Sequence, residues 1–175
     1  MKKILITGGS GLLGQYLNIE LSKENQILTL YRNNTGNCND NNSVQTDITD
    51  IDKLKNLFTT FKPDIVLHTA AIANPNTISG NSSGYIYSLN VTATKNIAEL
   101  CEKFNSKLIY TSTDLVYAGY RGSMLNEDAK LVPVSLYAET KLMGEVKIKE
   151  TFDNYIILRT ALLYGFGLNN SRCHF

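Results

Sequence analysis

The stretch "TGGSGLLG", residues 7–14, lies between a short apolar run and a longer amphipathic one. Three of its four glycines, Gly8, Gly11 and Gly14, recur at every third position. Without a Cβ atom the loop can turn tightly and bring backbone N–H groups close to a pyrophosphate, and a helix that begins here adds the positive end of its dipole. A small residue at Gly14 lets that helix pack closely on the strand. A plain tight turn is the alternative, but a glycine loop between a strand and a helix favours nucleotide binding.

Short apolar runs alternate with longer helical patterns along the rest of the chain. We expect strands at residues 3–7, 26–31, 64–70, 107–113 and 154–160, a short strand ending at 45–47, and helices at 12–24, 50–61, 84–104 and around 137–141. The Asn-rich segment 33–43 is predicted to be a solvated connection and not a helix. The alternation requires crossover connections, so the predicted fold is α/β: a Rossmann-type doubly wound parallel sheet with helices on both faces, in a single domain over 1–175.

The composition narrows the class of protein. With 43% hydrophobic and 19% charged residues among 175, the chain is typical of a soluble globular domain. A net charge of +1 argues against binding to nucleic acid or to an anionic membrane surface. The three cysteines and two histidines form no metal-ligand pattern, and Cys101 is expected in the core. The N-terminus is too poor in apolar residues for a signal peptide, and no apolar run is long enough to span a membrane, so the cytoplasm is the expected location.

The residues after the second predicted strand indicate which nucleotide would bind. An acidic residue about 20 positions past the glycines binds both ribose hydroxyls in NAD-binding proteins. This chain has Tyr31 and Arg32 there instead. A guanidinium can meet a 2′-phosphate, so NADP(H) is preferred and NAD(H) is the alternative. A solvated arginine at a strand end is an equally open interpretation of Arg32.

The stretch "SLYAETKLMGE", residues 135–145, places Tyr137 and Lys141 four residues apart, on one face of a helix. This spacing alone is common on solvated helix faces, so it does not identify a catalytic pair.

Taken together, "TGGSGLLG", "TSTDLVYAG" (111–119) and "YAETK" (137–141) resemble the extended short-chain dehydrogenases/reductases. The resemblance covers nearly all of the chain, with the motifs in the right order. It is strongest to the subgroup of dTDP-4-dehydrorhamnose reductase-like proteins. The stretches "STDLVYAG" and "NEDAKLVPVSLYAETKLMGE" of this chain resemble motifs of that subgroup. This subgroup implies reduction of a nucleotide-linked 4-keto sugar, and it allows a homodimer.

The resemblance implies roles for four residues. Tyr137 would donate a proton to the nascent alkoxide, and the Lys141 ammonium would lower its pKa and bind the nicotinamide ribose. Thr113 would orient the substrate carbonyl, and Asn90 would hold a water that links Lys141 to solvent. The alternatives are a strand-end cap for Thr113, a helix-surface amide for Asn90 and a solvated charge for Lys141.

The cofactor site follows from the same resemblance. Asp47, in "DITD" (47–50), would contact the adenine, and "HTAA" (68–71) would line the cofactor. The complete set of expected cofactor-binding residues is Gly8, Ser10, Gly11, Leu12, Leu13, Gly14, Arg32, Asp47, Ile48, Ala70, Ala71, Thr111, Tyr137 and Lys141.

Three other functions compete with a reductase. A 4,6-dehydratase of the superfamily carries an Asp-Glu pair after the threonine, whereas Asp114 is followed by Leu115, so the elimination base is missing. An epimerase ranks next among enzymes, and a non-catalytic regulatory subunit is the alternative from another class. Family members continue for more than a hundred further residues, so residues 165–175 are interpreted as the start of a truncated substrate-binding part, and we expect cofactor binding with doubtful turnover.

Overall fold

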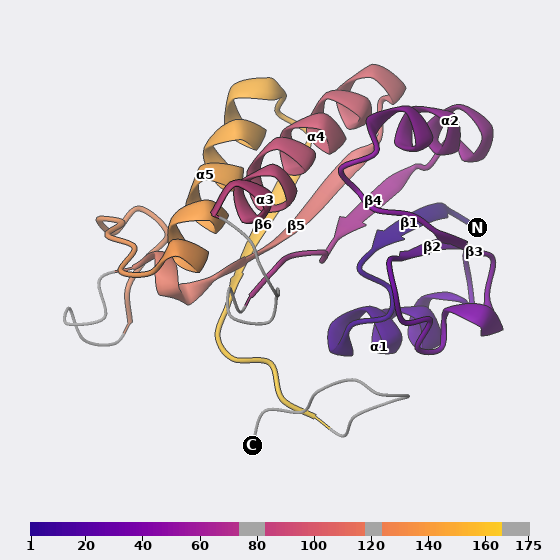
Figure 1. Ribbon diagram of the computed structural model, residues 1–175, viewed down its shortest axis with the longest axis horizontal. Coiled ribbons are helices and arrows are strands. Elements are labelled where there is room, and N and C mark those ends of the chain that lie inside the picture. The colour runs from indigo at the N-terminus through magenta and orange to yellow at the C-terminus, as the bar shows by residue number, and fades with distance from the viewer. Residues whose placement is uncertain (74–82, 118–123, 166–175) are drawn as a thin grey trace.

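The computed structural model (Figure 1) describes residues 1–73, 83–117 and 124–165. A six-stranded sheet runs through it in the order β3-β2-β1-β4-β5-β6, and every neighbouring pair of strands is parallel. The strands are β1 (Lys3–Thr7), β2 (Gln26–Tyr31), β3 (Ser43–Gln45), β4 (Ile65–His68), β5 (Lys107–Thr113) and β6 (Tyr155–Thr160). This arrangement confirms the Rossmann-type doubly wound sheet.

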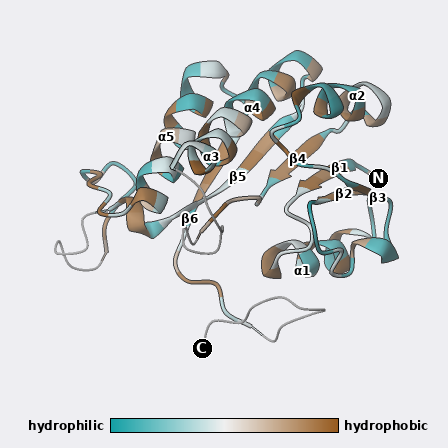
Figure 2. Ribbon diagram, in the orientation of Figure 1, coloured by the Kyte–Doolittle hydropathy of each residue, from teal (hydrophilic) through white to brown (hydrophobic). Residues whose placement is uncertain are grey.

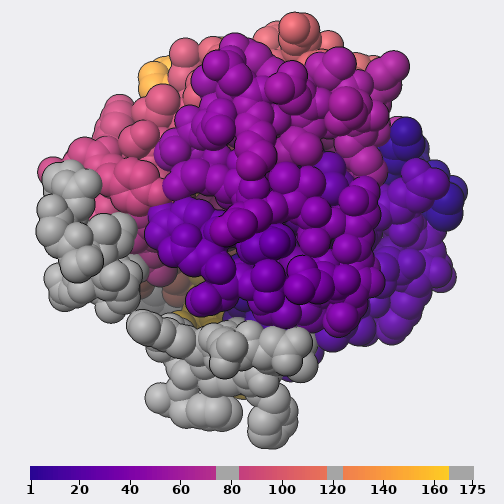
Figure 3. Space-filling model, turned by 45° about the vertical axis from the view of Figure 1, so that its right-hand side comes forward, coloured from indigo at the N-terminus to yellow at the C-terminus, as the bar shows by residue number. Residues whose placement is uncertain are grey.

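The helices cover both faces of the sheet, but unequally. They are α1 (Leu12–Leu21), α2 (Ile51–Phe61), α3 (Ser83–Tyr87), α4 (Ala93–Phe104) and α5 (Leu136–Thr151). Helices α2, α4 and α5 lie side by side over one face, whereas α1 lies on the other, beneath the N-terminal half of the sheet (Figure 1). In Figure 3 residues of the N-terminal part of the chain, coloured indigo to purple, form most of the near face.

Apolar side chains on the two faces of the sheet explain these layers. Strand residues on one face pack with Leu54 and Phe58 of α2, Ile97 of α4 and Ile148 of α5 in the larger core. Strand residues on the other face pack with Leu17 and Leu21 of α1. Figure 2 shows hydrophobic residues concentrated on the strands between the helices. Cys101 is buried in the larger core, as expected.

Local capping explains where two of the helices begin and end. The Asp50 side chain accepts a hydrogen bond of 3.0 Å from the backbone N–H of Lys53 and so caps α2. That helix ends at Phe61, and the next residue, Lys62, adopts a left-handed conformation before Pro63. Ser135 caps α5 in the same way, because its hydroxyl accepts a hydrogen bond from the N–H of Ala138.

Most predicted elements are confirmed, with shifts at their ends. Strands 3–7, 26–31 and 107–113 have the predicted bounds, whereas β4 is shorter than 64–70 and β3 ends at Gln45, before Asp47. The predicted helix 84–104 is present but not uniform, because a π-helical segment, Ser88–Thr92, lies between α3 and α4.

The description of segment 33–43 as solvated and non-helical was wrong in part. Cys38–Asp40 forms one turn of 3-10 helix, and Asn37 and Cys38 are buried. The amide of Asn37 donates to the backbone oxygen of Gln15 and accepts from Asn18, so polar contacts with α1 bury a segment that has few apolar residues.

Candidate functional site

The glycine loop follows β1 at the carboxyl edge of the sheet. Gly8 has a φ of +71°, and a Cβ atom there would lie 2.8 Å from the backbone nitrogen of Ala70. A Cβ atom on Gly14, inside α1, would collide with the backbone oxygen of Gly8. The close packing of helix and strand that the sequence predicts at Gly14 is therefore present.

Two adjoining hollows form one groove across this loop. The smaller, of about 290 Å³, lies toward β2 and β3, and the larger, of about 460 Å³, lies toward β5 and β6. Both are lined by Gly8, Gly11, Thr69 and Ala71. The groove therefore crosses the point between β1 and β4 where the strand order reverses, which is where open parallel sheets bind ligands.

The groove brings together most of the residues predicted from the sequence. The smaller hollow is lined by Ser10, Arg32, Asp47, Ile48 and Ala70, and the larger by Leu12, Leu13, Gly14, Thr111, Thr113 and Tyr137, in addition to the shared residues. Asn90 and Lys141 line neither hollow. Thr69, which belongs to the segment 68–71 that was expected to line the cofactor, lines both hollows.

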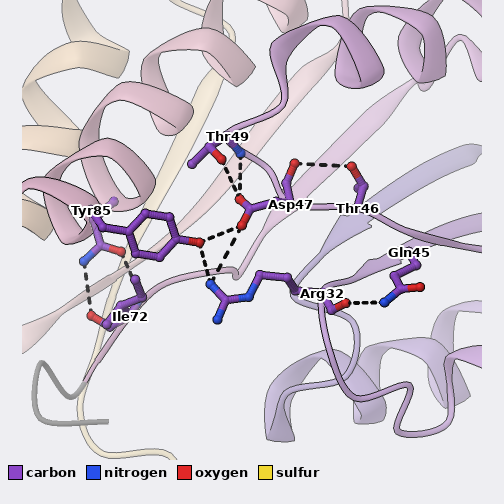
Figure 4. A network of polar contacts seen from close by, with 8 residues as sticks. Arg32, Gln45, Thr46, Asp47, Thr49, Ile72 and Tyr85 are labelled. Atoms are coloured by element: carbon purple, nitrogen blue, oxygen red, sulfur yellow. Dashed lines mark hydrogen bonds and ion pairs between the residues drawn. The ribbon is translucent and has the colours of Figure 1, made fainter. Parts of the chain in front are cut away.

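At the smaller hollow, Arg32 is held by two partners (Figure 4). Its Nη1 atom donates to the hydroxyl of Tyr85 at 2.5 Å and lies 3.8 Å from Oδ2 of Asp47. Tyr85 in turn donates to the same carboxylate oxygen at 2.6 Å. Arg32 is thus neither buried nor freely solvated. Tyr85, which no sequence pattern singled out, joins α3 to the ends of β2 and β3.

Asp47 is held in its ionised form by the same network. Burial alone would raise the pKa of Asp47. The net effect is a lower pKa, because Tyr85 and the backbone and hydroxyl of Thr49 donate hydrogen bonds to the carboxylate, and Arg32 adds its positive charge. This end of the groove therefore presents a carboxylate and a guanidinium side by side.

At the larger hollow, Thr113 ends β5 and is nearly buried. Its hydroxyl accepts a hydrogen bond from the backbone N–H of Leu115 at 3.2 Å and donates to Oδ1 of Asp114 at 3.3 Å. Thr113 therefore caps the strand end, which was the alternative interpretation of this residue from the sequence. It also lines the groove.

Tyr137 lies in the first turn of α5 and lines the same hollow. Its pKa is raised above the usual value, first by burial and then by the negative charge of Asp114. The lowering of this pKa by Lys141 that the sequence predicts is not found in this arrangement.

Lys141 lies one turn further along α5 and is buried, so the interpretation as a solvated charge was wrong. Its Nζ atom lies 3.9 Å from the centroid of the Tyr110 ring and makes no hydrogen bond to the described part of the chain. Burial lowers the pKa of Lys141 to about 7, and the charge of Glu145 partly offsets this effect. The charge of Lys141 also adds to burial in lowering the pKa of His68 to about 3, so this histidine is neutral.

Asn90 lies in the π-helical segment and is buried, so it is not a helix-surface amide. Its Oδ1 atom accepts from the N–H of Ile72 at 2.9 Å, and its Nδ2 atom donates to the oxygen of Ile72 at 3.2 Å and to the hydroxyl of Thr140 at 3.0 Å. Asn90 therefore joins the segment after β4 to α5, directly behind the groove.

A metal site and a membrane-spanning helix are both absent from the part of the chain that the structure describes. No group of three or more His, Cys, Asp or Glu side chains there is arranged to hold a metal ion. None of its helices has the length and apolar character needed to cross a bilayer.

The chain matches one protein family and several known proteins over nearly its whole length. The family model of the RmlD substrate binding domain matches residues 1–173. The chain is 30% identical to dTDP-4-dehydrorhamnose reductase of Aggregatibacter actinomycetemcomitans over 173 residues, which cover 97% of this chain and 54% of that protein. It is also 30% identical to methionine adenosyltransferase 2 subunit beta of Mus musculus over 168 residues, covering 94% of this chain and 48% of that protein.

A solved structure agrees with these matches. The dTDP-4-dehydrorhamnose reductase of Bacillus anthracis, in complex with NADP, superposes with a TM-score of 0.79 at 29% identity, covering 96% of this chain and 56% of that one. The chain thus spans about half the length of the relatives that it matches.

Proposed function

Because the chain belongs to the RmlD substrate binding domain family, we propose that it forms the cofactor-binding and catalytic part of an NAD(P)H-dependent reductase that acts on a nucleotide-linked 4-keto sugar. The observation that carries this proposal is the groove itself. It places the glycine loop, Thr113 and Tyr137 along one edge of the sheet, with the buried Lys141 behind them.

The residues of the groove fit a nicotinamide dinucleotide. The turn at Gly8 leaves no room for a Cβ atom, which suits a backbone that approaches a pyrophosphate closely, and α1 begins directly after the loop. Asp47 and Ile48 would hold the adenine end, and Thr111, Ala71 and Lys141 would hold the nicotinamide end. When bound, the cofactor supplies the hydride.

The protein's own part in the reaction is to orient the carbonyl and deliver a proton. Thr113 would bind the carbonyl oxygen through its hydroxyl, and Tyr137 would pass its phenolic proton to the same oxygen as negative charge develops there. The raised pKa of Tyr137 keeps that proton in place before reaction. A charged Lys141 would favour the resulting phenolate.

Arg32 supports a preference for NADP(H) over NAD(H). Its guanidinium lines the smaller hollow, where a 2′-phosphate would meet it. Asp47 works against this preference, because its carboxylate already pairs with the same guanidinium.

A non-catalytic, cofactor-binding regulatory subunit is the second candidate. The similarity to methionine adenosyltransferase 2 subunit beta favours it, since that protein matches over nearly as much of this chain as the reductase does, at the same identity.

Cofactor titration followed by an activity assay separates the two candidates. NADPH and NADH fluorescence should report saturable binding to this chain, and NADPH oxidation should follow addition of a dTDP-4-keto sugar, in this chain or in one extended by the C-terminal half of a matched reductase. Tyr137→Phe should abolish oxidation but not binding. Tyr87→Phe, an exposed tyrosine outside the groove, is the matched control and should change neither.

Absence of cofactor binding would refute both candidates. Cofactor binding without oxidation, in this chain and in its extended form, would favour the regulatory subunit.

A further inference from the structure

A fully buried carboxylate lies behind the catalytic end of the groove. Glu145, on the inner face of α5, has no exposed surface. Its Oε1 atom accepts from the hydroxyl of Ser112 at 2.6 Å and from Nε of Arg159 at 3.0 Å. Its Oε2 atom accepts from Nη2 of Arg159 at 2.7 Å. The carboxylate therefore joins α5 to both β5 and β6.

The same network reaches the segment beyond β5. Nη1 of Arg159 donates to the hydroxyl of Tyr117 at 2.7 Å and to the backbone oxygen of Glu127 at 2.9 Å. Ser112 directly precedes Thr113, and both line the larger hollow together with Thr160. One buried ion pair thus connects α5 to the ends of β5 and β6, which line this hollow, and to the segment beyond β5.

Glu145 lies one helical turn after Lys141, so the two side chains project from the same face of α5. The other groups around Lys141 carry no compensating charge. Tyr110 of β5 presents its ring, and His68 of β4 is neutral. Thr94 of α4 is hydrogen-bonded to His68, and Asn90 of the π-helical segment to Thr140, and neither of them titrates.

The remaining titratable groups lie on the groove side. Tyr137 is one turn before Lys141 on α5, and Asp114 acts on Tyr137. Within the described residues, Glu145 is the acidic group whose charge acts on Lys141 and opposes the effect of burial on its pKa.

We propose that Glu145 is a positioning residue that keeps the Lys141 ammonium charged inside the fold while it holds the ends of β5 and β6 together. This inference rests on the proposed function, because it assigns the charge of Lys141 a partner within the same site. Glu145 would act through Lys141 and would touch neither cofactor nor substrate.

The test is a titration of Lys141 in the protein without added cofactor. Its side-chain NMR resonances, assigned by their loss in Lys141→Arg, should titrate near pH 7 in the wild type. In Glu145→Gln the midpoint should fall by about one pH unit or more, since the neutral amide keeps the shape but removes the charge. Ser112→Ala, which removes one hydrogen bond and no charge, should leave the midpoint unchanged.

A second variant protects the test against misfolding, because Glu145→Gln leaves a buried guanidinium unpaired. The double variant Glu145→Gln, Arg159→Met removes the ion pair as a unit, which proteins often tolerate. Its midpoint should also fall, but by less than in Glu145→Gln, because loss of the Arg159 charge removes some repulsion on the Lys141 ammonium. An unchanged midpoint in the folded Glu145 variants, or an equal fall in Ser112→Ala, would overturn the inference.

Cofactor binding provides a second and separate result. If the ammonium helps to hold the cofactor, NADPH affinity should weaken as pH rises through the Lys141 midpoint, and Glu145→Gln should move this decline to lower pH. Failure of the wild type to bind NADPH would refute the proposed function, whereas the NMR titration would still decide the role of Glu145.

Discussion

The two ends of the groove contain the same three kinds of group in different surroundings. Arg32, Asp47 and Tyr85 meet at the smaller hollow, and Arg159, Glu145 and Tyr117 meet behind the larger one. The side chains of the first ion pair are 43% and 30% exposed and lie 3.8 Å apart. Those of the second are 12% and 0% exposed and lie 2.7 Å apart.

This difference in burial separates a network that can exchange its partners from one that is fixed in the fold. A half-exposed ion pair contributes little to stability, so Arg32 can exchange Asp47 for a phosphate at small cost. A buried pair is costly to break, because the charge that remains is left without its partner and without water to hydrate it. The network at the smaller hollow is therefore suited to the proposed recognition of a cofactor, and the one behind the larger hollow is suited to holding the ends of β5 and β6 in place.

The largest effect is expected from breaking the buried pair. Arg159→Met leaves the Glu145 carboxylate without its main partner and should lower the free energy of unfolding by about 3–5 kcal/mol. Urea denaturation measures this loss. Arg32→Met is the matched control at the exposed pair and should lower it by less than about 1 kcal/mol. Similar losses in the two variants would show that burial does not distinguish the networks.

A smaller effect is expected from the pH dependence of stability. The pKa of Lys141 is about 7 in the folded chain against 10.5 for the free side chain, so between these values the unfolded chain binds more protons. Stability from this group should therefore rise with pH across that window, by on the order of 1 kcal/mol per pH unit at most.

Lys141→Met removes this contribution and provides the control. The difference in unfolding free energy between wild type and variant should become more favourable to the wild type from pH 7 toward pH 10. If this difference in unfolding free energy did not vary with pH, Lys141 would titrate at its ordinary value, and water would reach its ammonium group in the folded chain.

The smallest effect is expected at the exposed network. Arg32→Ala should weaken NADPH binding by about tenfold and leave NADH binding nearly unchanged, because only NADPH carries the 2′-phosphate. Asp47→Asn, which removes the competing carboxylate, should shift the ratio of the two dissociation constants a few-fold toward NADPH. Equal weakening for both cofactors in Arg32→Ala would contradict a phosphate-binding role.

Local patterns predicted most of the fold. The bounds of β2 and β5 follow from continuous apolar, β-branched runs, and the start of α2 follows from the capping side chain of Asp50. The π-helical segment Ser88–Thr92 could not be predicted, because its neighbours, including the bonds that Asn90 makes to Ile72 and Thr140, lie on other elements.

Only those parts of the site that depend on local sequence patterns could be predicted. The spacing of the glycines and of Tyr137 and Lys141 is a local property, so it could be recognised in the chain. Tyr85 is 38 residues from Asp47, and Glu145 is 33 residues from Ser112, so neither contact has a local signal.

The amino-acid sequence by itself determined the order of strands and helices, the glycine loop after β1 and the residues that the groove would collect. These depend on backbone preferences and on the period of apolar residues, which act between neighbours in the chain. The tertiary structure alone decided which charges are buried, that Arg32 is paired with Asp47, and that Lys141 lies out of solvent beside Tyr110 and one turn from Glu145. A pKa and the strength of an ion pair depend on the surrounding dielectric, and only the packed fold sets that.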